Sequence, residues 1–475
     1  MTRPPVFAAV DIGASSGRVV AGSVAGDRIT TEVVHRFPNG MQTRDGHLRW
    51  DLTGLFEEVL TGLTRLAARY DDVVSIGIDT WAVDYGLLDA DGRLLAEPIA
   101  YRDDRTDAVI TEVDSVISRE RQYEINGLQF LPFNTIYQLA AERRGGRLEQ
   151  AERAVLLPDL LGFWLTGVLR TEITNASTTG LLDARSRSWS TETFAALDLP
   201  ADLFPPLIEP GDTLGSVTSG IVERTGLAAG TTVVAVGSHD TASAVVAVPA
   251  ETRDIAYVSS GTWSLVGVEL DAPVINDASR AANFTNEGGV DARVRFLRNV
   301  GGLWLLQESL REWSTAGGYA DLQTLLDRAA ALPAGGPVID VDDDAFIAPD
   351  DMPARIQQAC RASAQEVPED EPAIVRCVLD SLADAYARTV AQVQELTDRR
   401  VEIVHVVGGG SQNTLLCQLT ADRAGRPVLA GPTEATALGN VAVQARTAGS
   451  LQGALEDLRA RLRRVLELRR YEPAA

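Results

Sequence analysis

The chain opens with a strand-like segment that returns through a glycine- and serine-rich turn into a second strand-like segment. Residues 6–10 are apolar, residues 11–18 are rich in Gly and Ser, and residues 19–24 resume an apolar strand pattern. This order predicts a β-hairpin. A dinucleotide-binding fold and a P-loop both need a strand, a loop and then a helix, and neither has the spacing found between Gly13 and Gly17. The segment therefore excludes both of these nucleotide sites.

A second unit of the same kind lies in the other half of the chain. Residues 254–259 form a strand-like segment that leads into Ser260, Gly261 and Thr262. A chain of 475 residues is too long for one hydrophobic core, and its composition shifts near residue 245. We predict two domains, residues 1–244 and residues 245–475.

The net charge of −23 limits the partners of the chain. Nucleic acids and anionic membranes are bound through Lys and Arg side chains that neutralise phosphate, so neither is expected as a partner. No apolar run approaches the roughly 18 residues that span a bilayer. The first six residues have no apolar leader segment, so a cytoplasmic location is expected. The sequence leaves the oligomeric state open between a monomer and a homodimer.

Lysine is absent, and all 43 basic residues are arginines. A P-loop and a protein kinase each need a lysine on the phosphates of ATP, and Schiff-base chemistry needs an amine, so all three are excluded. An ATP site in this chain must neutralise phosphate with backbone N–H groups and a divalent cation.

The three cysteines, Cys360, Cys377 and Cys417, form no CxxC pair, and none is adjacent to a histidine. A zinc site or a thiol nucleophile is therefore not favoured. Cys360 and Cys377 could form a bridge, but we expect reduced thiols in the cytosol.

The two glycine turns are candidate phosphate sites. Such turns can point successive N–H groups at a phosphate, and Asp11 is placed to hold Mg²⁺ through water. The alternative is that Asp11 caps the turn and that Arg18 is an exposed strand charge. The turn at Thr262 has the alternative of an ordinary β-turn. Together the turns indicate phosphate binding more strongly than either does alone.

Asp240 is the candidate catalytic residue. It follows an apolar strand at residues 233–236 and precedes a small-residue helix at residues 242–248. A sugar hydroxyl that attacks a phosphorus needs a carboxylate to accept its proton. The alternatives are that Asp240 is a helix N-cap and that the adjacent His239 is a core histidine.

Three consecutive glycines, at residues 408–410, follow a strand-like segment at residues 401–407 and precede a predicted helix from Thr414. Glycine permits a flat ligand to approach the backbone closely, so this junction suits the adenine and ribose of a nucleotide. The alternative is a common turn between a strand and a helix.

Ten segments in chain order resemble the rhamnulokinases of the FGGY family of carbohydrate kinases, and together they cover the chain from about residue 6 to about residue 445. They are residues 11–18, 35–40, 77–84, 101–103, 130–135, 238–244, 259–264, 283–289, 303–307 and 407–413. Their order along the chain is highly specific, whereas no single segment is.

The resemblance implies an α/β fold of two actin-like ATPase (ribonuclease-H-like) domains that flank a catalytic cleft. It implies ATP and Mg²⁺ as cofactors, and it implies transfer of the γ-phosphoryl group to the 1-hydroxyl of L-rhamnulose. The implied partners are therefore a small-molecule sugar and ATP.

The resemblance also implies roles for single residues. Asp240 would be the proton acceptor. The ATP phosphates would contact Ala14, Ser15, Ser16, Gly17 and Arg18, and the nucleotide would contact Thr262, Gln307 and Gly409. The ketose would contact Ala82, His239, Asp240, Thr241 and Asn299. The family usually has Gly at the position of Ala82, and the additional methyl group puts the identity of the ketose in doubt.

Three alternatives stay open. The first is a kinase for another ketose, such as L-fuculose or L-xylulose, because a pocket wall distinguishes a deoxy methyl group by only about 1–3 kcal/mol. The second is a non-catalytic actin-like ATPase, which has no reason to retain the polyol-binding cluster of His239, Asp240 and Thr241. The third, an NAD-dependent dehydrogenase, is disfavoured because no G-x-G-x-x-G motif follows the first strand.

Overall fold

The computed structural model describes residues 4–26, 28–316, 321–347 and 349–474. Met1–Arg3, which form part of the segment used for the expected location, lie outside the described residues. The chain forms two compact units. Unit 1 comprises Met1–Glu251, Glu269–Phe296 and Ala435–Val465, and unit 2 comprises Thr252–Val268, Leu297–Glu434 and Leu466–Ala475. The division into residues 1–244 and 245–475 stays a prediction.

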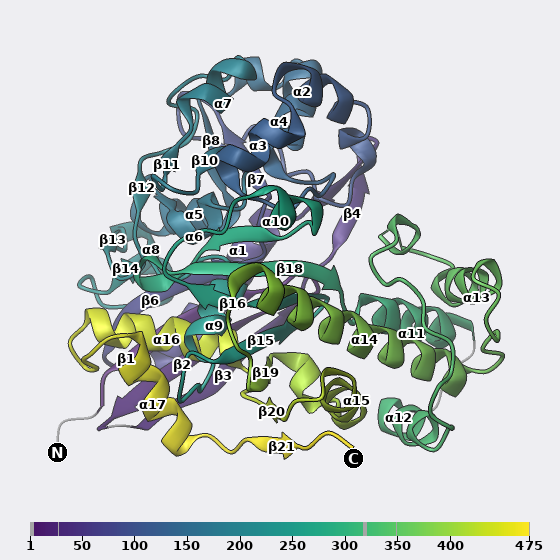
Figure 1. The fold of residues 1–475 in the computed structure, drawn as a ribbon. Coiled ribbons are helices and arrows are strands. Elements are labelled where there is room, and N and C mark those ends of the chain that lie inside the picture. Colours follow the sequence, from purple (N-terminus) through teal and green to yellow (C-terminus); the bar gives the residue numbers. More distant parts are fainter. Residues whose placement is uncertain (1–3, 27, 317–320, 348, 475) are drawn as a thin grey trace. The chain divides into compact units, whose positions relative to one another are not determined.

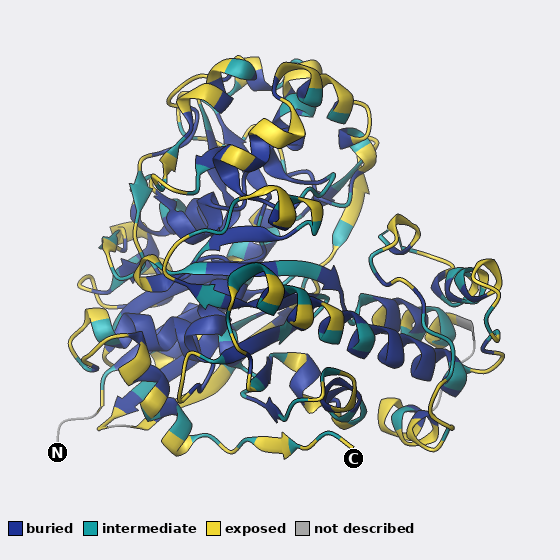
Figure 2. Cartoon of the chain, viewed as in Figure 1, coloured by how far each residue is buried: buried dark blue, intermediate teal, exposed yellow. Residues whose placement is uncertain are grey.

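A six-stranded sheet with the order β13-β14-β6-β1-β2-β3 forms the centre of unit 1 (Figure 1). β1 and β2 are antiparallel, which confirms the predicted hairpin, whereas β1 and β6 are parallel, as are β6 and β14. All residues of β1 and nearly all of β6 are buried, and they are dark blue in Figure 2. The strands are β1 (Val6–Ile12), β2 (Ser16–Ala25), β3 (Arg28–Pro38), β6 (Val73–Thr80), β13 (Thr213–Ser216) and β14 (Thr232–Val234).

Helices pack on this sheet through apolar stripes. The apolar periodicity of residues 52–69 predicts an amphipathic helix, and these residues form α1 (Leu52–Arg69), which buries Leu55, Val59 and Leu66. Its N-cap, Asp51, accepts a hydrogen bond from Gly54 N. Among the other helices that contact the sheet are α5 (Leu157–Thr166), α9 (Asp240–Val246), α16 (Ala435–Thr447) and α17 (Leu455–Val465), and α8 (Ser219–Thr225) packs on α1.

Between residues 107 and 180 the sequence pattern predicts helices, interrupted by a loop at residues 127–134. The structure has α2 (Ile110–Val116), α3 (Arg119–Asn126) and α4 (Thr135–Arg144) here, but Arg153–Leu156 forms β8, which pairs with β7 (Tyr85–Leu88). A short apolar run suits a buried strand or a buried helix equally, and a partner distant in sequence decided between them.

The remaining elements of unit 1 are short. The strands are β4 (Met41–Arg44), β5 (His47–Trp50), β9 (Thr171–Glu172), β10 (Leu182–Asp183), β11 (Ser188–Trp189), β12 (Leu207–Ile208) and β17 (Thr285–Gly288). The helices are α2 (Ile110–Val116), α3 (Arg119–Asn126), α4 (Thr135–Arg144), α6 (Ile173–Ala176), α7 (Thr191–Ala196), α10 (Asp277–Ala281) and α17 (Leu455–Val465).

Unit 2 is built on strands in the order β18-β16-β15-β19-β20-β21. The second predicted hairpin is confirmed, because β15 and β16 are antiparallel with Ser260 opposite Ser264. β19 lies parallel to β15 and β20. The strands are β15 (Ile255–Ser260), β16 (Trp263–Leu270), β18 (Val294–Gly301), β19 (Ile403–Val407), β20 (Val428–Ala430) and β21 (Arg469–Tyr471).

The C-terminal segment corrects a second expectation. The amphipathic, Arg-rich pattern of residues 451–469 predicts a single helix, but α17 comprises only Leu455–Val465 and the chain continues into β21, which pairs with β20. A free edge of β20 supplies the backbone partner, and this edge leaves no pattern in the local sequence.

The helices of unit 2 are α11 (Trp304–Ala316), α12 (Leu322–Ala330), α13 (Met352–Ala362), α14 (Glu371–Thr397) and α15 (Thr414–Ala424). α14 packs against α12 and α15. Cys360 and Cys377 are free, and their sulfur atoms lie 3.9 Å apart. No helix within the described part of the chain combines the length and the apolar character required to cross a bilayer.

Candidate active site

Three parallel strands of unit 1 carry acidic residues to one edge of the sheet. Asp11 is the last residue but one of β1, and it lies opposite Asp79 on β6. Thr80 N donates to Ser238 O at 2.9 Å, which places the segment before Asp240 beside the end of β6. The carboxyl ends of parallel strands meet at one edge of a sheet. The three carboxylates therefore lie at the same edge although they come from segments that are distant in sequence.

The first glycine turn is closed by one hydrogen bond of its own backbone and by one from a side chain. Gly13 N donates to Ser16 O at 2.9 Å, and Asn39 Nδ2 donates to Gly13 O at 2.8 Å. A Cβ atom at Gly17 would lie 2.2 Å from the ring of Phe37, so glycine is required there by the close approach of the ring.

Arg18 is bound to Asp11 and is not an exposed strand charge. Its Nη2 lies 2.6 Å from Asp11 Oδ2, and the two side chains are 19% and 5% exposed. A charge-assisted hydrogen bond of this length orients the carboxylate of Asp11. Sequence reasoning named both residues but did not foresee that they pair.

Asp79 is the functional candidate that sequence reasoning missed. It is 0% exposed, its Oδ2 accepts from Asn440 Nδ2 at 2.5 Å, and no described residue gives its Oδ1 a hydrogen bond. Burial and the neighbouring charge of Asp11 raise the pKa of Asp79 well above its ordinary value, and Asp240 adds to this effect. The sequence signal that could have identified Asp79 is an acidic residue near the end of a buried strand, which is also the position of Asp11.

A hydrogen-bonded network supports Asp79 from α16. Gln444 Nε2 donates to Asn440 Oδ1 at 2.6 Å and to Ala8 O at 3.0 Å, and Ser75 Oγ donates to Gln444 Oε1 at 2.7 Å. The network joins α16 to β1 and β6 within unit 1. Polar networks of this kind hold buried side chains in one arrangement.

Asp240 is the first residue of α9, and His239 occupies the N-cap position. Its side chain is 30% exposed, and its Oδ1 accepts from Thr241 Oγ1 at 3.1 Å. The N-cap alternative is therefore wrong for Asp240. An acidic residue in the first turn also interacts favourably with the helix dipole.

The segment before Asp240 is held by Glu172. Its Oε2 accepts from Ser238 Oγ at 2.7 Å, from Ser238 N at 3.1 Å and from Thr174 Oγ1 at 2.6 Å. Burial raises the pKa of Glu172, and the bonds from Thr174 and Ser238 oppose this rise. Glu172 thus fixes the backbone that carries His239 and Asp240.

The loop after β6 carries a strained residue beside the predicted sugar contact Ala82. Val83 has a φ of +67°, which a β-branched residue rarely adopts. Thr135 Oγ1 donates to Val83 O at 2.7 Å, and Asp84 N donates to Ala82 O at 2.9 Å. Backbone strain of this kind gathers at ligand sites, where surrounding contacts maintain it.

Asp84 anchors the same loop. Its Oδ2 accepts from Trp50 Nε1 at 2.6 Å and from Trp81 Nε1 at 2.9 Å, and its Oδ1 accepts from Gln138 Nε2 at 3.1 Å. Burial raises the pKa of Asp84 to about 6, against these hydrogen bonds.

The raised pKa of Asp84 predicts a pH dependence of stability. Its protonated form is favoured in the folded state, so its contribution to stability is complete below the ordinary pKa of 3.8 and is lost as the pH rises through about 6. Relative to Asp84→Asn, the wild type should lose up to about 3 kcal/mol of unfolding free energy across this window. Urea unfolding of both proteins between about pH 4 and 7 measures the difference, and a pH-independent difference would contradict it.

The predicted nucleotide residues lie in unit 2. The turn between β15 and β16 meets the start of α11, where Trp304 N donates to Thr262 O at 3.2 Å and Thr262 Oγ1 lies 3.5 Å from Gln307 Oε1. Thr262 and Gln307 are therefore neighbours, and their contact with the nucleotide stays a prediction. Asn299 lies on β18, and its predicted contact with the sugar stays a prediction.

The glycine segment after β19 also belongs to unit 2. Gly408 has a φ of +81°, and a Cβ atom at Gly410 would lie 2.0 Å from Ser260 Oγ. Gly409 begins a short 3₁₀ helix (Gly409–Gln412), and no atom within 4 Å would meet a Cβ there. A side chain at Gly409 would thus meet open space, and the contact of this junction with the nucleotide stays a prediction.

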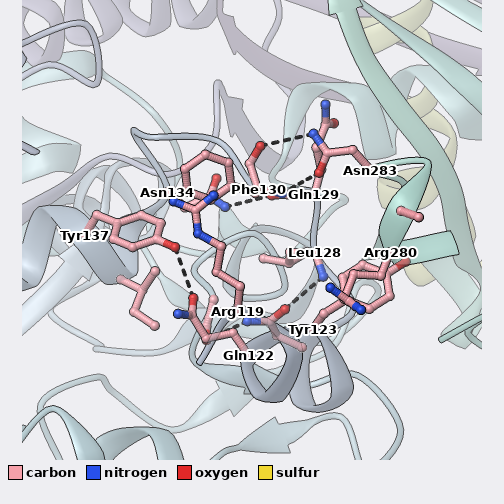
Figure 3. Close-up of a pocket in the computed structure, with 14 residues that line it drawn as sticks. Arg119, Gln122, Tyr123, Leu128, Gln129, Phe130, Asn134, Tyr137, Arg280 and Asn283 are labelled. Carbon is pink, nitrogen blue, oxygen red and sulfur yellow. Dashed lines mark hydrogen bonds between the residues drawn. The ribbon is translucent and has the colours of Figure 1, made fainter. Parts of the chain in front are cut away.

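A separate cavity of about 290 Å³ lies in unit 1 beside α3 and α4 (Figure 3). The guanidinium of Arg119 stacks 3.7 Å from the ring centroid of Phe130, and Tyr137 OH donates to Gln122 Oε1 at 3.2 Å. Asn283 Oδ1 accepts from Phe130 N at 2.8 Å. Its wall is made of residues other than the predicted site residues, so the cavity is distinct from the acidic sheet edge.

Within the described ranges, no group of three or more His, Cys, Asp or Glu could hold a metal ion by itself. Mg²⁺ usually keeps several waters and takes one or two carboxylates together with the phosphates of a substrate. The Oδ1 atom of Asp79, buried beside Asp11, is an oxygen ligand of the type that Mg²⁺ binds. The residues present therefore fit a hydrated, nucleotide-bound Mg²⁺.

The fold is that of the two-domain sugar kinases, which are homologous to the actin-like ATPases. A gluconate kinase from Lactobacillus acidophilus has a TM-score of 0.81 at 17% identity, over 99% of this chain and 94% of that chain. A glycerol kinase from Plasmodium falciparum has a TM-score of 0.76 at 16% identity, over the same shares. At these identities the likeness concerns the fold alone, and it confirms the predicted fold class.

The sequence comparisons give the family. Residues 6–247 match the N-terminal domain and residues 256–448 match the C-terminal domain of the FGGY family of carbohydrate kinases. A rhamnulokinase from Bacteroides thetaiotaomicron is 43% identical over 98% of this chain and 96% of its own length. A rhamnulokinase from Klebsiella pneumoniae is 46% identical over 93% and 90%.

The chain belongs to the FGGY family of carbohydrate kinases. It is therefore a phosphotransferase that uses ATP as a substrate and an alcohol group as acceptor.

Proposed function

We propose that the chain transfers the γ-phosphoryl group of ATP to O1 of L-rhamnulose, which yields L-rhamnulose 1-phosphate and ADP. The observation that carries the proposal is the similarity to rhamnulokinases, which extends over nearly the whole chain at 43% identity. The position of Asp240 at the start of α9, partly exposed and next to His239, is consistent with it.

Asp240 is proposed as the general base. Thr241 Oγ1 donates to Oδ1, which leaves Oδ2 to accept the proton of the sugar O1–H. The O1–Pγ bond forms as the bond from Pγ to the bridging oxygen breaks, and ADP leaves with the electron pair of that bond. Because Arg18 is the basic residue of the first turn, the backbone N–H groups of this turn supply the remaining phosphate contacts.

The other site residues keep the roles that the family resemblance implies. In this proposal the phosphates contact Ala14, Ser15, Ser16, Gly17 and Arg18, the nucleotide contacts Thr262, Gln307 and Gly409, and the ketose contacts Ala82, His239, Thr241 and Asn299.

Magnesium is proposed to be held through water by Asp11 and Asp79. When bound, Mg²⁺ neutralises charge on the phosphates of ATP. Arg18 orients the carboxylate of Asp11 at 2.6 Å, and Asn440 orients that of Asp79 at 2.5 Å. Both carboxylates thus present one oriented oxygen to the cation.

Asp79→Asn is expected to weaken Mg²⁺ binding to the ADP complex by about 10-fold, as loss of an outer-shell carboxylate does. The asparagine Oδ1 can still accept from Asn440, so the fold should be retained. Calorimetric titration of Mg²⁺ into the ADP complex measures the effect, with Asp11→Asn as a comparator that should show a loss of similar size. An unchanged Mg²⁺ affinity in Asp79→Asn would remove this residue from the metal site.

A kinase assay with a panel of ketoses tests the proposed function. L-rhamnulose should give the highest kcat/KM, and L-fuculose and L-xylulose should give lower values. A clear preference for another ketose would replace L-rhamnulose as substrate. ATP turnover that does not depend on added sugar would contradict the kinase mechanism itself.

A further inference from the structure

We infer that Arg295, held by Glu287, fixes His239 with its ring proton on Nε2, and that this N–H donates to the C2 oxygen of a ketose whose O1 faces Asp240. The inference rests on the proposed function and deepens it, because it identifies the group of the substrate that is recognised beside the attacking hydroxyl. Arg295 and Glu287 are positioning residues in this arrangement.

Arg295 lies at the start of β18, where residues 294–296 belong to unit 1, and its side chain is 0% exposed. Its Nε donates to Gly288 O at 2.8 Å, and its Nη2 lies 3.0 Å from Glu287 Oε2. A buried charge needs a paired opposite charge and hydrogen bonds, which Glu287 and the backbone of β17 provide. The pair is therefore a fixed element of unit 1 behind the predicted sugar site.

The same guanidinium determines which ring nitrogen of His239 accepts a hydrogen bond. Arg295 Nη2 lies 3.1 Å from His239 Nδ1 in hydrogen-bonding geometry. A guanidinium has donors and no acceptor, so this contact is a hydrogen bond only if Nδ1 accepts. In neutral imidazole the proton must then reside on Nε2.

Glu287 is the competing partner for the same nitrogen. Its Oε2 lies 3.2 Å from His239 Nδ1, and this contact would require a proton on Nδ1. The same oxygen is closer to Arg295 Nη2, at 3.0 Å, and the attraction between full charges favours that partner. Glu287 therefore holds Arg295, and Arg295 sets the tautomer.

The Nε2–H group faces the catalytic carboxylate without bonding to it. Nε2 lies 3.6 Å from Asp240 Oδ1, which exceeds hydrogen-bonding distance. The site thus presents a donor next to an acceptor. Two oxygens on adjacent carbons match this pair when O1–H donates to Asp240 and the C2 oxygen accepts from His239.

Nitrogen NMR of the protein labelled with ¹⁵N-histidine tests the tautomer directly, in the absence of sugar. The chain has four histidines, and the spectrum of His239→Gln identifies the signals of His239. The wild type should show the Nε2–H tautomer. In Arg295→Met the proton should move to Nδ1, where Glu287 accepts it. An Nδ1–H tautomer in the wild type would overturn the inference.

Two variants keep this test decisive. Arg298→Met alters another arginine of β18, which pairs with Asp342 at 2.9 Å, and it should leave the tautomer of His239 unchanged. If Arg295→Met does not fold, Glu287→Gln retains the guanidinium and should retain Nε2–H. A switch to Nδ1–H in Glu287→Gln would show that the carboxylate and not the guanidinium sets the tautomer, which would overturn the inference.

Kinetics test the contact with the sugar, on whichever ketose the panel prefers. His239→Leu should lower kcat/KM by about 10- to 100-fold, because the enclosed C2 oxygen is left without its hydrogen bond, and His239→Gln should recover most of this loss. An analogue with hydrogen in place of the C2 oxygen should be used equally by the wild type and by His239→Leu. A full loss in His239→Leu with this analogue would overturn the contact, whereas a wrong ketose assignment would leave the tautomer result unchanged.

Discussion

Asp240→Asn is expected to lower kcat by about 10³- to 10⁴-fold, because the amide cannot accept the proton of the attacking hydroxyl. Asn is isosteric with Asp, and its Oδ1 can still accept from Thr241 Oγ1, the bond that holds the wild-type side chain at 3.1 Å. KM for the sugar and the affinity for ATP should therefore change little. Steady-state kinetics with calorimetric binding of ATP separate the two effects.

Asp277→Asn is a matched control for this substitution. Asp277 is also the first residue of a helix, α10, and its side chain is 99% exposed. Any loss that comes from removing a charge at a helix N-terminus should appear in both variants, at no more than about 1 kcal/mol of stability. A kcat for Asp240→Asn within about tenfold of the wild type would remove Asp240 as the base, since general-base catalysis supplies about 10²-fold or more.

Gly439→Ala is expected to destabilise unit 1 by about 2–3 kcal/mol, through overpacking between two helices. Gly439 lies in α16, and a Cβ atom there would lie 1.9 Å from Ser243 O and 3.1 Å from Val246 Cβ. Both partners belong to α9, the helix that begins at Asp240. The helices must separate, so kcat should fall together with stability. Thermal unfolding and kinetics of the same variant measure both.

The sign of this effect is opposite to helix propensity, which favours Ala over Gly by about 1 kcal/mol in a helix interior. Gly220→Ala, in α8, is the matched control, because no atom lies within 4 Å of the added Cβ. This variant should be stabilised by about 0.5–1 kcal/mol. Equal stability of Gly439→Ala and the wild type would show that α9 and α16 separate at little cost.

The tertiary contacts behind the site could not be predicted from local patterns. Asn440 is 361 residues from Asp79, and Arg295 is 56 residues from His239, yet both pairs are hydrogen-bonded. A strand pattern at Arg153–Leu156 became visible only through its pairing with Tyr85–Leu88. Each depends on which segments meet in space, and hydrophobic periodicity carries no such information.

The sequence alone determined both glycine hairpins, helix α1 and the membership of the chain in its kinase family, because each depends on residues close together in the chain or on motifs in a set order. It placed the helix after Asp240 at residues 242–248, whereas α9 comprises Asp240–Val246. The tertiary structure alone decided the pairing of Asp11 with Arg18, the burial of Asp79 and the orientation of the His239 ring by Arg295. These features arise where strand ends and helices distant in sequence meet. There the energy of buried polar groups depends on the partners that folding brings to them.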